Sequence, residues 1–390
     1  ANNGGVASTL IDINNTTGGT INLAVGGAPS GSVVPNEILD VGGEGIVIDS
    51  NASTAINIGN ATLINSVSTA ISVQSDKSTT TIETVPNTAA DPSYTAGIVK
   101  NTAGAAIALT AGAPNFEYFG TINNSPASSP GFLIQADNLS VTDGTNGITI
   151  GGPGLYPLVD NGDGIFMSAI QGDGTISVTG ADLQGTGTTG ILLENLPAAA
   201  TAAPTLAFQN TRIGGTSAGP SNQGILISGL GNSTTASKVR FTNLNIALTG
   251  TGAEGIRAIT PAGLTATEVN VLGASTLSNS STTQAAINLQ NIDLGSATAT
   301  PVAGMNWITL QSGNTTATGA ATPPIDPGVV TAIVIDPTTA NESTGEINIT
   351  GNFTVGTGGT AAAGTGLNVN NGSQNPGGVT VQVNGTQINP

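Results

Sequence analysis

One short sequence element recurs along the chain and constrains its fold more than any other feature. The element is a small residue, then Ile or Leu, then any residue, then a second aliphatic residue. It begins at residues 45, 55, 70, 147, 190, 224, 255, 286, 332 and 366. The Ile residues at 191, 225, 256 and 287 are 34, 31 and 31 residues apart, which is the length of a structural repeat and not of a domain.

A second element of eight residues lies between copies of the first. It has an aliphatic residue at its first and last positions, an aliphatic residue, an aromatic residue or Ala at the third, and a polar residue or Gly at the fifth. Its copies align without gaps at 176–183, 206–213, 239–246, 264–271 and 381–388. The alternation predicts a half-buried strand. Asn or Gly at the fifth position predicts a bend with positive φ before the closing apolar residue.

Two short strands that alternate at a period near 31 residues predict coils that stack on one another. A single coil cannot bury its apolar side, whereas stacked coils share one aliphatic core. We therefore expect an all-β, single-stack parallel β-solenoid with irregular loop insertions. The segment 287–294 fits either element, and the 46 residues from Ile287 to Ile333 predict a coil with a long insertion.

The competing fold is a string of immunoglobulin-like sandwiches. Such domains are about 100 residues long and have aromatic anchors in their cores. Aromatic residues make up only 3% of this chain, and no pattern repeats near that length. The solenoid is therefore the better interpretation.

The two elements resemble the coils of the right-handed parallel β-helix superfamily, the pectin-lyase-like fold that many bacterial autotransporter passengers share. The resemblance covers most of the chain. It implies regular solenoid coils over 137–390 and a less regular part of the solenoid, with insertions, over 1–136. It also implies a right-handed coil, and it brings in the polysaccharide lyases and hydrolases of this superfamily as functional candidates.

The composition excludes several kinds of chemistry. The 390 residues include no Cys and no His, so the chain has no disulfide, no thiolate nucleophile and no imidazole base. Its 6 Lys and Arg residues against 23 Asp and Glu residues give a net charge of -17, which disfavours nucleic acid and anionic lipid as partners. The longest apolar stretches are broken by Pro and are shorter than the ~20 residues of a transmembrane helix, so we expect no membrane insertion.

Acidic residues on Gly-rich turns suggest one metal site. Asp160, Asp163 and Asp173 offer carboxylate and carbonyl oxygens, which suit Ca²⁺. The spacing departs from that of an EF-hand loop, and the alternative is that these are ordinary turn residues. A weaker second cluster consists of Glu37, Asp40, Glu44 and Asp49. Calcium is the one cofactor that the sequence suggests.

The residues that an enzyme of this superfamily needs are mostly missing. The resemblance implies Ca²⁺-binding Asp residues with an Arg or Lys base for a lyase, and paired Asp residues with Gly-His-Gly and Arg-Ile-Lys for a hydrolase like polygalacturonase. The chain has no His and no adjacent Asp pair. Neighbouring coils could place Arg240 or Arg257 beside Glu254 or Glu268; the alternative is a surface ion pair worth under ~1 kcal/mol. We expect no catalytic residues and no enzyme.

Two further features have both a functional and a structural interpretation. The aromatic cluster at 116–119 is either a contact for a carbohydrate or partner, or packing of an insertion against the solenoid. Sequons that would accept a glycan in a glycosylating host are frequent, although a chain so rich in Asn, Ser and Thr contains many by chance. They include Asn51, Asn60, Asn138, Asn232, Asn279, Asn314, Asn341, Asn348, Asn352, Asn371 and Asn384.

The terminal segments lack the helix or charged residues with which monomeric solenoids cover their strand edges. Segment 379–388 has no charged residue, and 8–13 and 20–25 have strand character. Two interpretations remain open: trimmed boundaries of a larger protein, or head-to-tail pairing between subunits. Because the sequence begins with Ala1, we expect either that a signal peptide has been removed or that the chain belongs to a longer precursor.

These features together predict a non-enzymatic structural protein that is extracellular or on a cell surface. We expect a subunit of a filament, sheath or coat that pairs with itself through terminal strands. The first alternative is an adhesin or autotransporter-type passenger that binds a cell surface or a glycan. The second alternative is a polysaccharide lyase or hydrolase.

Overall fold

The computed structural model describes the strands of the chain and many of the turns beside them. Side chains are described at positions between residues 11 and 257. The described backbone covers residues 11–15, 21–25, 37–41, 43–50, 54–58, 62–66, 68–74, 81–84, 98–101, 104–110, 115–118, 121–124, 129–135, 138–139, 147–160, 163–168, 170–172, 175–184, 187–196, 205–214, 219–230, 237–248, 254–259, 267–272, 276–279, 287–290, 307–312, 325–326, 331–336, 345–351, 354–355, 365–369, 379–384 and 387–388.

The chain divides into two compact units, residues 1–187 and 188–390. This division follows packing within each unit. The expected boundary at residue 137 rested instead on the regularity of the sequence repeats. The division into compact units therefore neither confirms nor contradicts that boundary.

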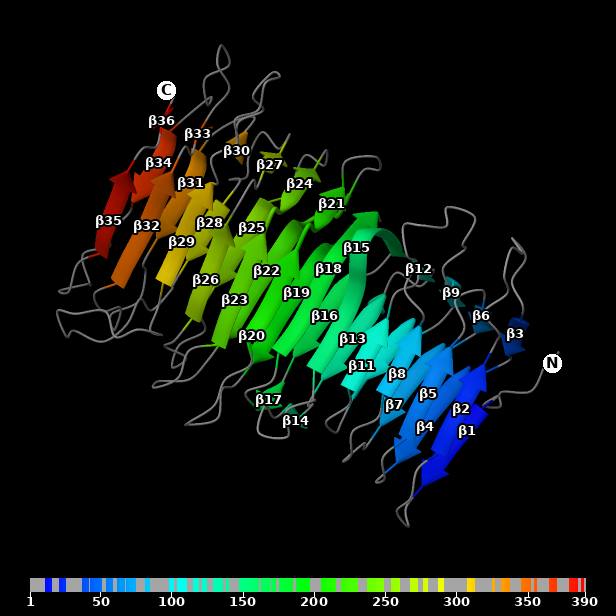
Figure 1. Cartoon of the computed structure of the whole chain (residues 1–390). Helices are drawn as coiled ribbons and strands as arrows, with labels where there is room; N and C mark the ends of the chain where they lie inside the picture. Colours follow the sequence, from blue (N-terminus) through cyan, green and yellow to red (C-terminus); the bar gives the residue numbers. More distant parts are fainter. Residues whose placement is uncertain are drawn as a thin grey trace. The chain divides into compact units, whose positions relative to one another are not determined.

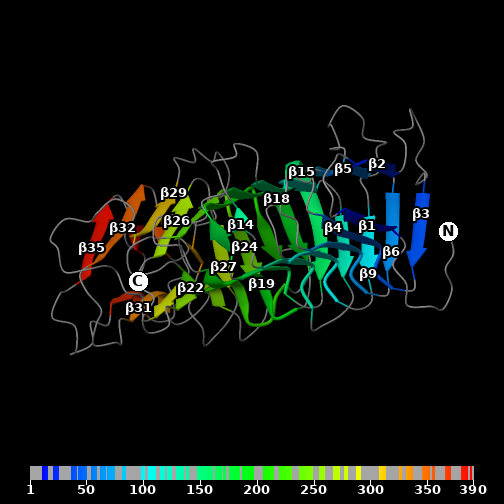
Figure 2. The same cartoon turned by 90° about the horizontal axis from the view of Figure 1, so that it is seen from below.

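Three ladders of parallel strands build unit 1, and Figure 2 shows them as the sides of a coil. The first ladder consists of β1 (Ile11–Asn15), β4 (Ile46–Ser50), β7 (Ile71–Gln74), β10 (Ile107–Leu109), β13 (Phe132–Gln135) and β16 (Ile165–Ser168). The second begins with β2 (Ile21–Val25), β5 (Thr54–Ile58), β8 (Thr81–Thr84) and β11 (Asn115–Tyr118). The third begins with β3 (Glu37–Val41), β6 (Thr62–Ser66), β9 (Ile98–Asn101) and β12 (Thr121–Asn124). The long strands β15 (Gly147–Asp160) and β18 (Thr175–Gln184) continue both, and β14 (Asn138–Leu139) pairs separately with β17 (Gln171–Gly172).

Unit 2 repeats this three-ladder plan, and Figure 1 shows much of its second ladder in green to red. The first ladder consists of β19 (Thr189–Leu196), β22 (Gln223–Leu230), β25 (Glu254–Ile259), β28 (Ile287–Gln290), β31 (Thr331–Asp336) and β34 (Thr365–Val369). The second consists of β20 (Thr205–Gln209), β23 (Ser237–Thr242), β26 (Thr267–Leu272), β29 (Trp307–Ser312), β32 (Gly345–Gly351) and β35 (Val379–Asn384). The third consists of β21 (Arg212–Gly214), β24 (Asn245–Leu248), β27 (Thr276–Asn279), β30 (Ile325–Asp326), β33 (Thr354–Val355) and β36 (Gln387–Ile388).

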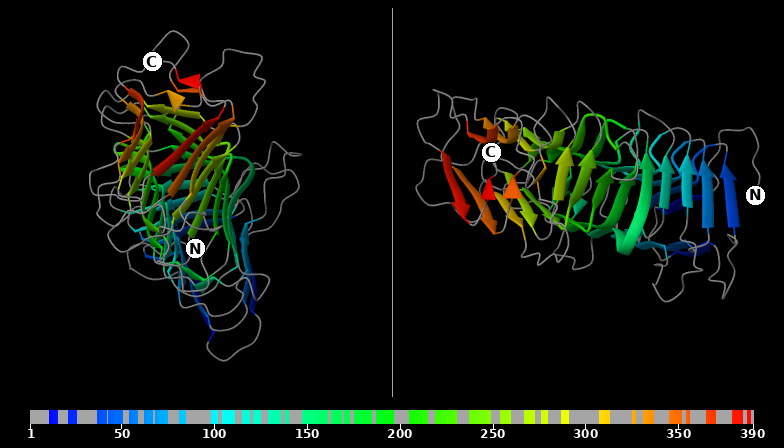
Figure 3. Two further views of the ribbon diagram at one scale, coloured as in Figure 1. Left: turned by 90° about the vertical axis from the view of Figure 1, so that its left-hand side faces the viewer. Right: turned by 90° about the horizontal axis from the view of Figure 1, so that it is seen from above.

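Each unit is therefore a parallel β-solenoid, and the predicted fold class is confirmed. The strands that follow one another in a ladder come from successive coils, as the views in Figure 3 also show. The described residues form strands, turns and bends, and they include no helix that is long and apolar enough to cross a membrane. The right-handed coil and the specific superfamily stay predictions.

The predicted bend at the fifth position of the second element is present in the copies at 176–183, 206–213 and 239–246. Gly180, Asn210 and Asn243 have φ values of 71°, 52° and 55°. Gly and Asn are the residues that adopt this left-handed conformation most readily. In unit 2 the bend ends the second strand of the coil at β20 and β23 and precedes the third strand at β21 and β24. The element that we expected to be one bent strand is thus two strands there.

The core is a set of register lines in which like residues lie above one another. In unit 1, Ile46, Ile71, Ile107, Phe132 and Ile165 are consecutive ladder partners, and each side chain is fully buried at 0% exposure. In unit 2 the corresponding line contains Ile191, Ile225 and Ile256. Burial of one such aliphatic side chain stabilises a fold by roughly 1.5–3 kcal/mol.

Aromatic residues contribute more to the core than their number indicates. Phe208 and Phe241 are ladder partners whose rings stack at a centroid distance of 4.9 Å. Phe116, Phe132, Phe208 and Phe241 are all among the largest fully buried side chains. The expected purely aliphatic core is therefore mixed.

The small residue that opens the first element has a steric cause in unit 2. A Cβ atom on Gly190 would lie 2.7 Å from the carbonyl oxygen of Gly224, and a Cβ atom on Gly224 would lie 2.7 Å from that of Gly255. These glycines sit where the chain enters the first ladder and where Ile213 or Ile246 from the third ladder packs against the backbone. The corner therefore has no room for a larger side chain.

The ladders also correct some of the sequence assignments. Ile56 and Ile148, which carry the pattern of the first element, lie in the second ladder of unit 1. The gapless alignment of 264–271 was wrong, because Val269 and not Leu264 is the ladder partner of Val239. The ambiguous segment at Ile287 belongs to the first ladder, and Ile287 is the direct partner of Ile333, as the predicted insertion requires.

Candidate functional site

The residues predicted to bind calcium are only partly described. Asp160 ends strand β15 and is the ladder partner of Asn124, but its side chain lies outside the described part. Asp163 is half-buried, and its backbone carbonyl accepts a hydrogen bond from the amide of Gly131 at 3.0 Å. Asp173 lies outside the described residues. The calcium site remains a prediction.

The second acidic cluster is likewise incomplete. Glu37 and Asp40 lie on β3 without described side chains, and Glu44 and Asp49 are half-buried beside and on β4. Within the described part of the chain, no three acidic residues come close enough together to hold a metal ion.

The expected pairing of Arg with an acid occurs within one strand. Nη1 of Arg257 lies 3.4 Å from Oε2 of Glu254, and both residues are on β25. The Glu254 side chain is 3% exposed and that of Arg257 is 32% exposed, so the carboxylate is held inside the coil while the guanidinium reaches its surface. The other two expected residues lie on neighbouring strands: Arg240 is exposed on β23, and Glu268 on β26 is the ladder partner of Lys238.

Glu254 belongs to a row of polar residues that are ladder partners near the start of successive first-ladder strands in unit 2. Thr189, Gln223 and Glu254 are consecutive ladder partners, with Thr189 and Glu254 only 5% and 2% exposed. The Glu254 amide donates to the Asn222 carbonyl at 2.7 Å, and the Asn222 amide donates to the Thr188 carbonyl at 2.9 Å. These contacts bind successive coils together, which is a structural role for the row.

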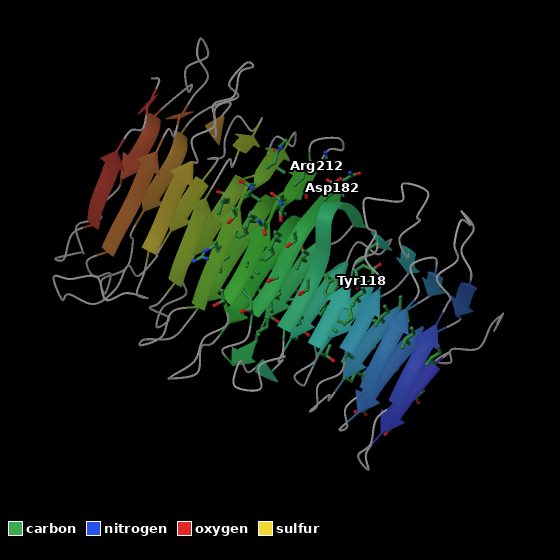
Figure 4. All side chains as sticks on the ribbon, in the orientation of Figure 1. Tyr118, Asp182 and Arg212 are labelled. Atoms are coloured by element: carbon green, nitrogen blue, oxygen red, sulfur yellow. The ribbon has the colours of Figure 1, made fainter. Side chains whose placement is uncertain are left out.

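A second buried carboxylate, Asp182, is a site residue that the sequence reasoning missed. Asp182 on β18 is 2% exposed, and Nε2 of Gln184 donates a hydrogen bond to its Oδ2. Figure 4 labels Asp182. The alternation of Asp182 with the apolar Ala181 and Leu183 gave no sign that it would be buried.

Tyr118, which Figure 4 also labels, belongs to a buried aromatic cluster. Its ring lies 6.5 Å from that of Phe116 and 6.4 Å from that of Phe132, and Phe116 lies 5.7 Å from Phe132. Burial raises the pKa of the Tyr118 hydroxyl well above its usual range, so the group stays protonated. Phe116 and Tyr118 therefore pack inside the solenoid. Both lie on β11, a strand of the second ladder, so they are part of the coil itself and do not pack an insertion against it.

Comparisons with protein-family models, with curated proteins and with solved structures found no match for this chain. Its function therefore has to be inferred from its own geometry.

Proposed function

We propose that this chain is a structural protein, a subunit of an extracellular filament, sheath or coat. One observation carries the proposal: residues of the same kind repeat in register from coil to coil. Ile follows Ile along the first ladder, Phe241 lies on Phe208, and Asn243 lies on Asn210. A coil built in this way is a template for the next coil, whichever chain supplies it.

The first and last strands of the described ladders have matching patterns. In unit 1, strand β2 places Leu23 in the same register line as Ile56, Ile82 and the buried Phe116. In unit 2, strand β35 places Val381 in the register line that begins with the buried Leu206 and Val239. Neither β2 nor β35 contains a charged residue, so pairing of two such strands would avoid like-charge repulsion despite the net charge of -17.

The chemistry of the chain supports a passive role outside the cell. Charged residues make up 7% of the sequence, and the chain contains neither Cys nor His. Such a chain offers no thiol to oxidants and no thiolate or imidazole ligand to transition-metal ions. The buried carboxylate Glu254 and the cluster around Tyr118 are engaged in packing and in contacts between strands.

Electron microscopy of the purified full-length chain, at several concentrations and with and without Ca²⁺, tests this proposal. We expect uniform filaments whose number grows with concentration. Two single substitutions in β35 provide a matched pair: Val381→Glu lies in the core register line, and Gln382→Glu lies one residue later on the opposite face of the strand. Both add one negative charge, but only Val381→Glu should abolish filaments.

Isolated particles at every concentration would overturn the proposed function. Filaments that survive Val381→Glu, with the fold verified by circular dichroism, would overturn assembly through β35. Filaments that form only with Ca²⁺ and are lost in Asp163→Asn would add support for the predicted calcium site.

A further inference from the structure

Two exposed side chains of opposite charge stand out among the described residues. Of the charged side chains whose burial the structure describes, Asp12 on β1 and Arg240 on β23 are the two that are exposed. The others, such as Glu44, Glu194 and Arg257, are half-buried or buried. Within the described part of the chain, neither Asp12 nor Arg240 has an ion pair. Asp12 belongs to unit 1 and Arg240 to unit 2.

Strand alternation directs both side chains away from the core. On β23, Arg240 is exposed next to the buried Phe241. On β1, the buried Ile13 lies between the exposed Asp12 and Asn14. Neighbouring residues of a strand point to opposite faces of its sheet. Asp12 and Arg240 are therefore on outer faces of their ladders, where a second molecule can reach them.

The positions beside Arg240 carry no negative charge. Its ladder partners are Ala207 on β20 and Asn270 on β26, and Glu268 of β26 is the partner of Lys238 instead. Three of the 6 basic residues of the chain lie on β20, β21, β23 and β24, and these four strands contain no Asp or Glu. The three basic residues are Arg212, Lys238 and Arg240. We call the outer face of these four strands the basic surface.

The positions beside Asp12 carry no positive charge. Its ladder partner on β4 is Val47, and the neighbouring partners are Asn14 and the half-buried Asp49. Residues 11–15 and 43–50 include Asp12, Glu44 and Asp49 and no Lys or Arg. We call the outer face of β1 and β4 the acidic surface.

We propose that the basic surface of one copy of this chain binds the acidic surface of a second copy, with Arg240 beside Asp12. Chains with a net charge of -17 repel one another, so a contact between copies needs surfaces of opposite charge. The two surfaces meet this need with the exposed charges that the described part of the chain offers. The contact joins outer faces of strands, whereas the proposed filament contact joins the edge of β35 to another strand. If the filament forms, as the proposed function holds, this second contact joins filaments side by side into a sheath or coat.

Sedimentation of the full-length chain tests the contact without filaments. Val381→Glu serves as the background, because it should remove the contact through β35. We expect association that grows with protein concentration at low salt and weakens as salt is added. Arg240→Gln should weaken it about two- to fivefold. Asn222→Asp is the matched control, because it changes the net charge equally at an exposed position just before β22 and should have no effect.

Exchange of the two charges tests which residues meet. Arg240→Asp and Asp12→Arg should each weaken association, and the chain with both substitutions should recover it. Asp12→Arg is the sharper variant, because it makes the net charge less negative. Without a specific contact it would strengthen association, whereas the proposal requires that it weaken association.

The same variants give a second readout in the wild-type background. Electron microscopy at low salt should show filaments lying side by side, and Arg240→Asp should separate them without shortening them. If the wild-type chain forms no filaments but the sedimentation results are as expected, the contact stands and the proposed function falls.

Three results would overturn the proposed contact. The first is the absence of salt-dependent association at every concentration. The second is association that Arg240→Asp does not weaken or that the double exchange does not restore. The third is Arg240-dependent binding of polyglutamate by a chain that does not associate with itself, which would assign the basic surface to a different acidic partner.

Discussion

Nδ2 of Asn243 donates a hydrogen bond to Oδ1 of Asn210 at 3.0 Å, and both residues have positive φ, 55° and 52°. The same residue type thus bends each coil and links it to the next one. Backbone hydrogen bonds join the two coils on either side of this contact, since the Asn210 amide donates to the Thr242 carbonyl at 2.9 Å and the Asn245 amide donates to the Thr211 carbonyl at 2.8 Å. The bend is therefore a contact between coils as well as a turn within one.

Substitution of Asn243 should separate these two roles. Asn243→Gly keeps the left-handed backbone and removes the side-chain hydrogen bond, so we expect a loss of about 0.5–1.5 kcal/mol in the free energy of unfolding. Asn243→Ala removes the bond and also adds the cost of a left-handed Ala, about 1–2 kcal/mol more. Urea denaturation measures both. Equal losses for the two variants would show that backbone conformation is not what selects Asn here.

Gly224 should be intolerant of any side chain. Gly224→Ala places a Cβ atom 2.7 Å from the Gly255 carbonyl oxygen and 3.1 Å from Cγ2 of Ile246, so one coil must shift against the next. We expect a destabilisation of about 1–3 kcal/mol by thermal unfolding. The control is Ala106→Gly at the equivalent corner in unit 1, which removes a methyl group and should cost less than about 1 kcal/mol. A neutral Gly224→Ala would refute the steric explanation of the corner.

Glu254 should contribute to stability through its buried contacts. Glu254→Ala removes a 3% exposed carboxylate and leaves Arg257 without this partner at 3.4 Å, so we expect a loss of about 1–3 kcal/mol. Removal of Glu194, which is half-buried on β19, should stay within about 0.5 kcal/mol. Chemical denaturation of both variants provides the comparison, and losses of the same size would argue against a specific role for Glu254.

The burial of Tyr118 predicts a loss of stability at alkaline pH. The hydroxyl pKa is raised in the folded state, whereas in the unfolded chain it has its usual value of about 10. Above that pH the unfolded state loses a proton that the folded state keeps, so the free energy of unfolding falls as pH rises. Tyr118→Phe should flatten this fall. An ultraviolet titration in which all 3 tyrosines ionise before unfolding would contradict the prediction.

Features that depend on local conformation could be predicted from the sequence. Asn210, Asn243 and Gly180 share a conformation that few residue types adopt, so their position in the second element predicts the bend. The repeat of Ile along the first ladder also follows from the sequence, because stacked coils need an aliphatic residue at the same place in each turn.

Features that depend on long-range register could not be predicted in this way. Ile148 and Ile46 sit in the same local pattern, and only their ladder partners, Ile176 and Ile71, assign them to different sheets. The burial of Asp182 depends in the same way on surroundings that its own sequence neighbours do not reveal. The calcium prediction used spacing along the chain alone, and spacing does not say which turns lie above one another.

Ile287 and Ile333 are direct ladder partners although they are 46 positions apart in the sequence. The first ladder thus fixes the position to which the chain returns in each coil. It does not fix the number of residues between one first-ladder strand and the next. Lineages of such a protein could lengthen, shorten or exchange the connections before β29 and between β29 and β30 while the strands keep their partners. Variation in these connections would then accumulate independently of the ladders, and a foreign peptide inserted between β28 and β29 should be tolerated without loss of the fold.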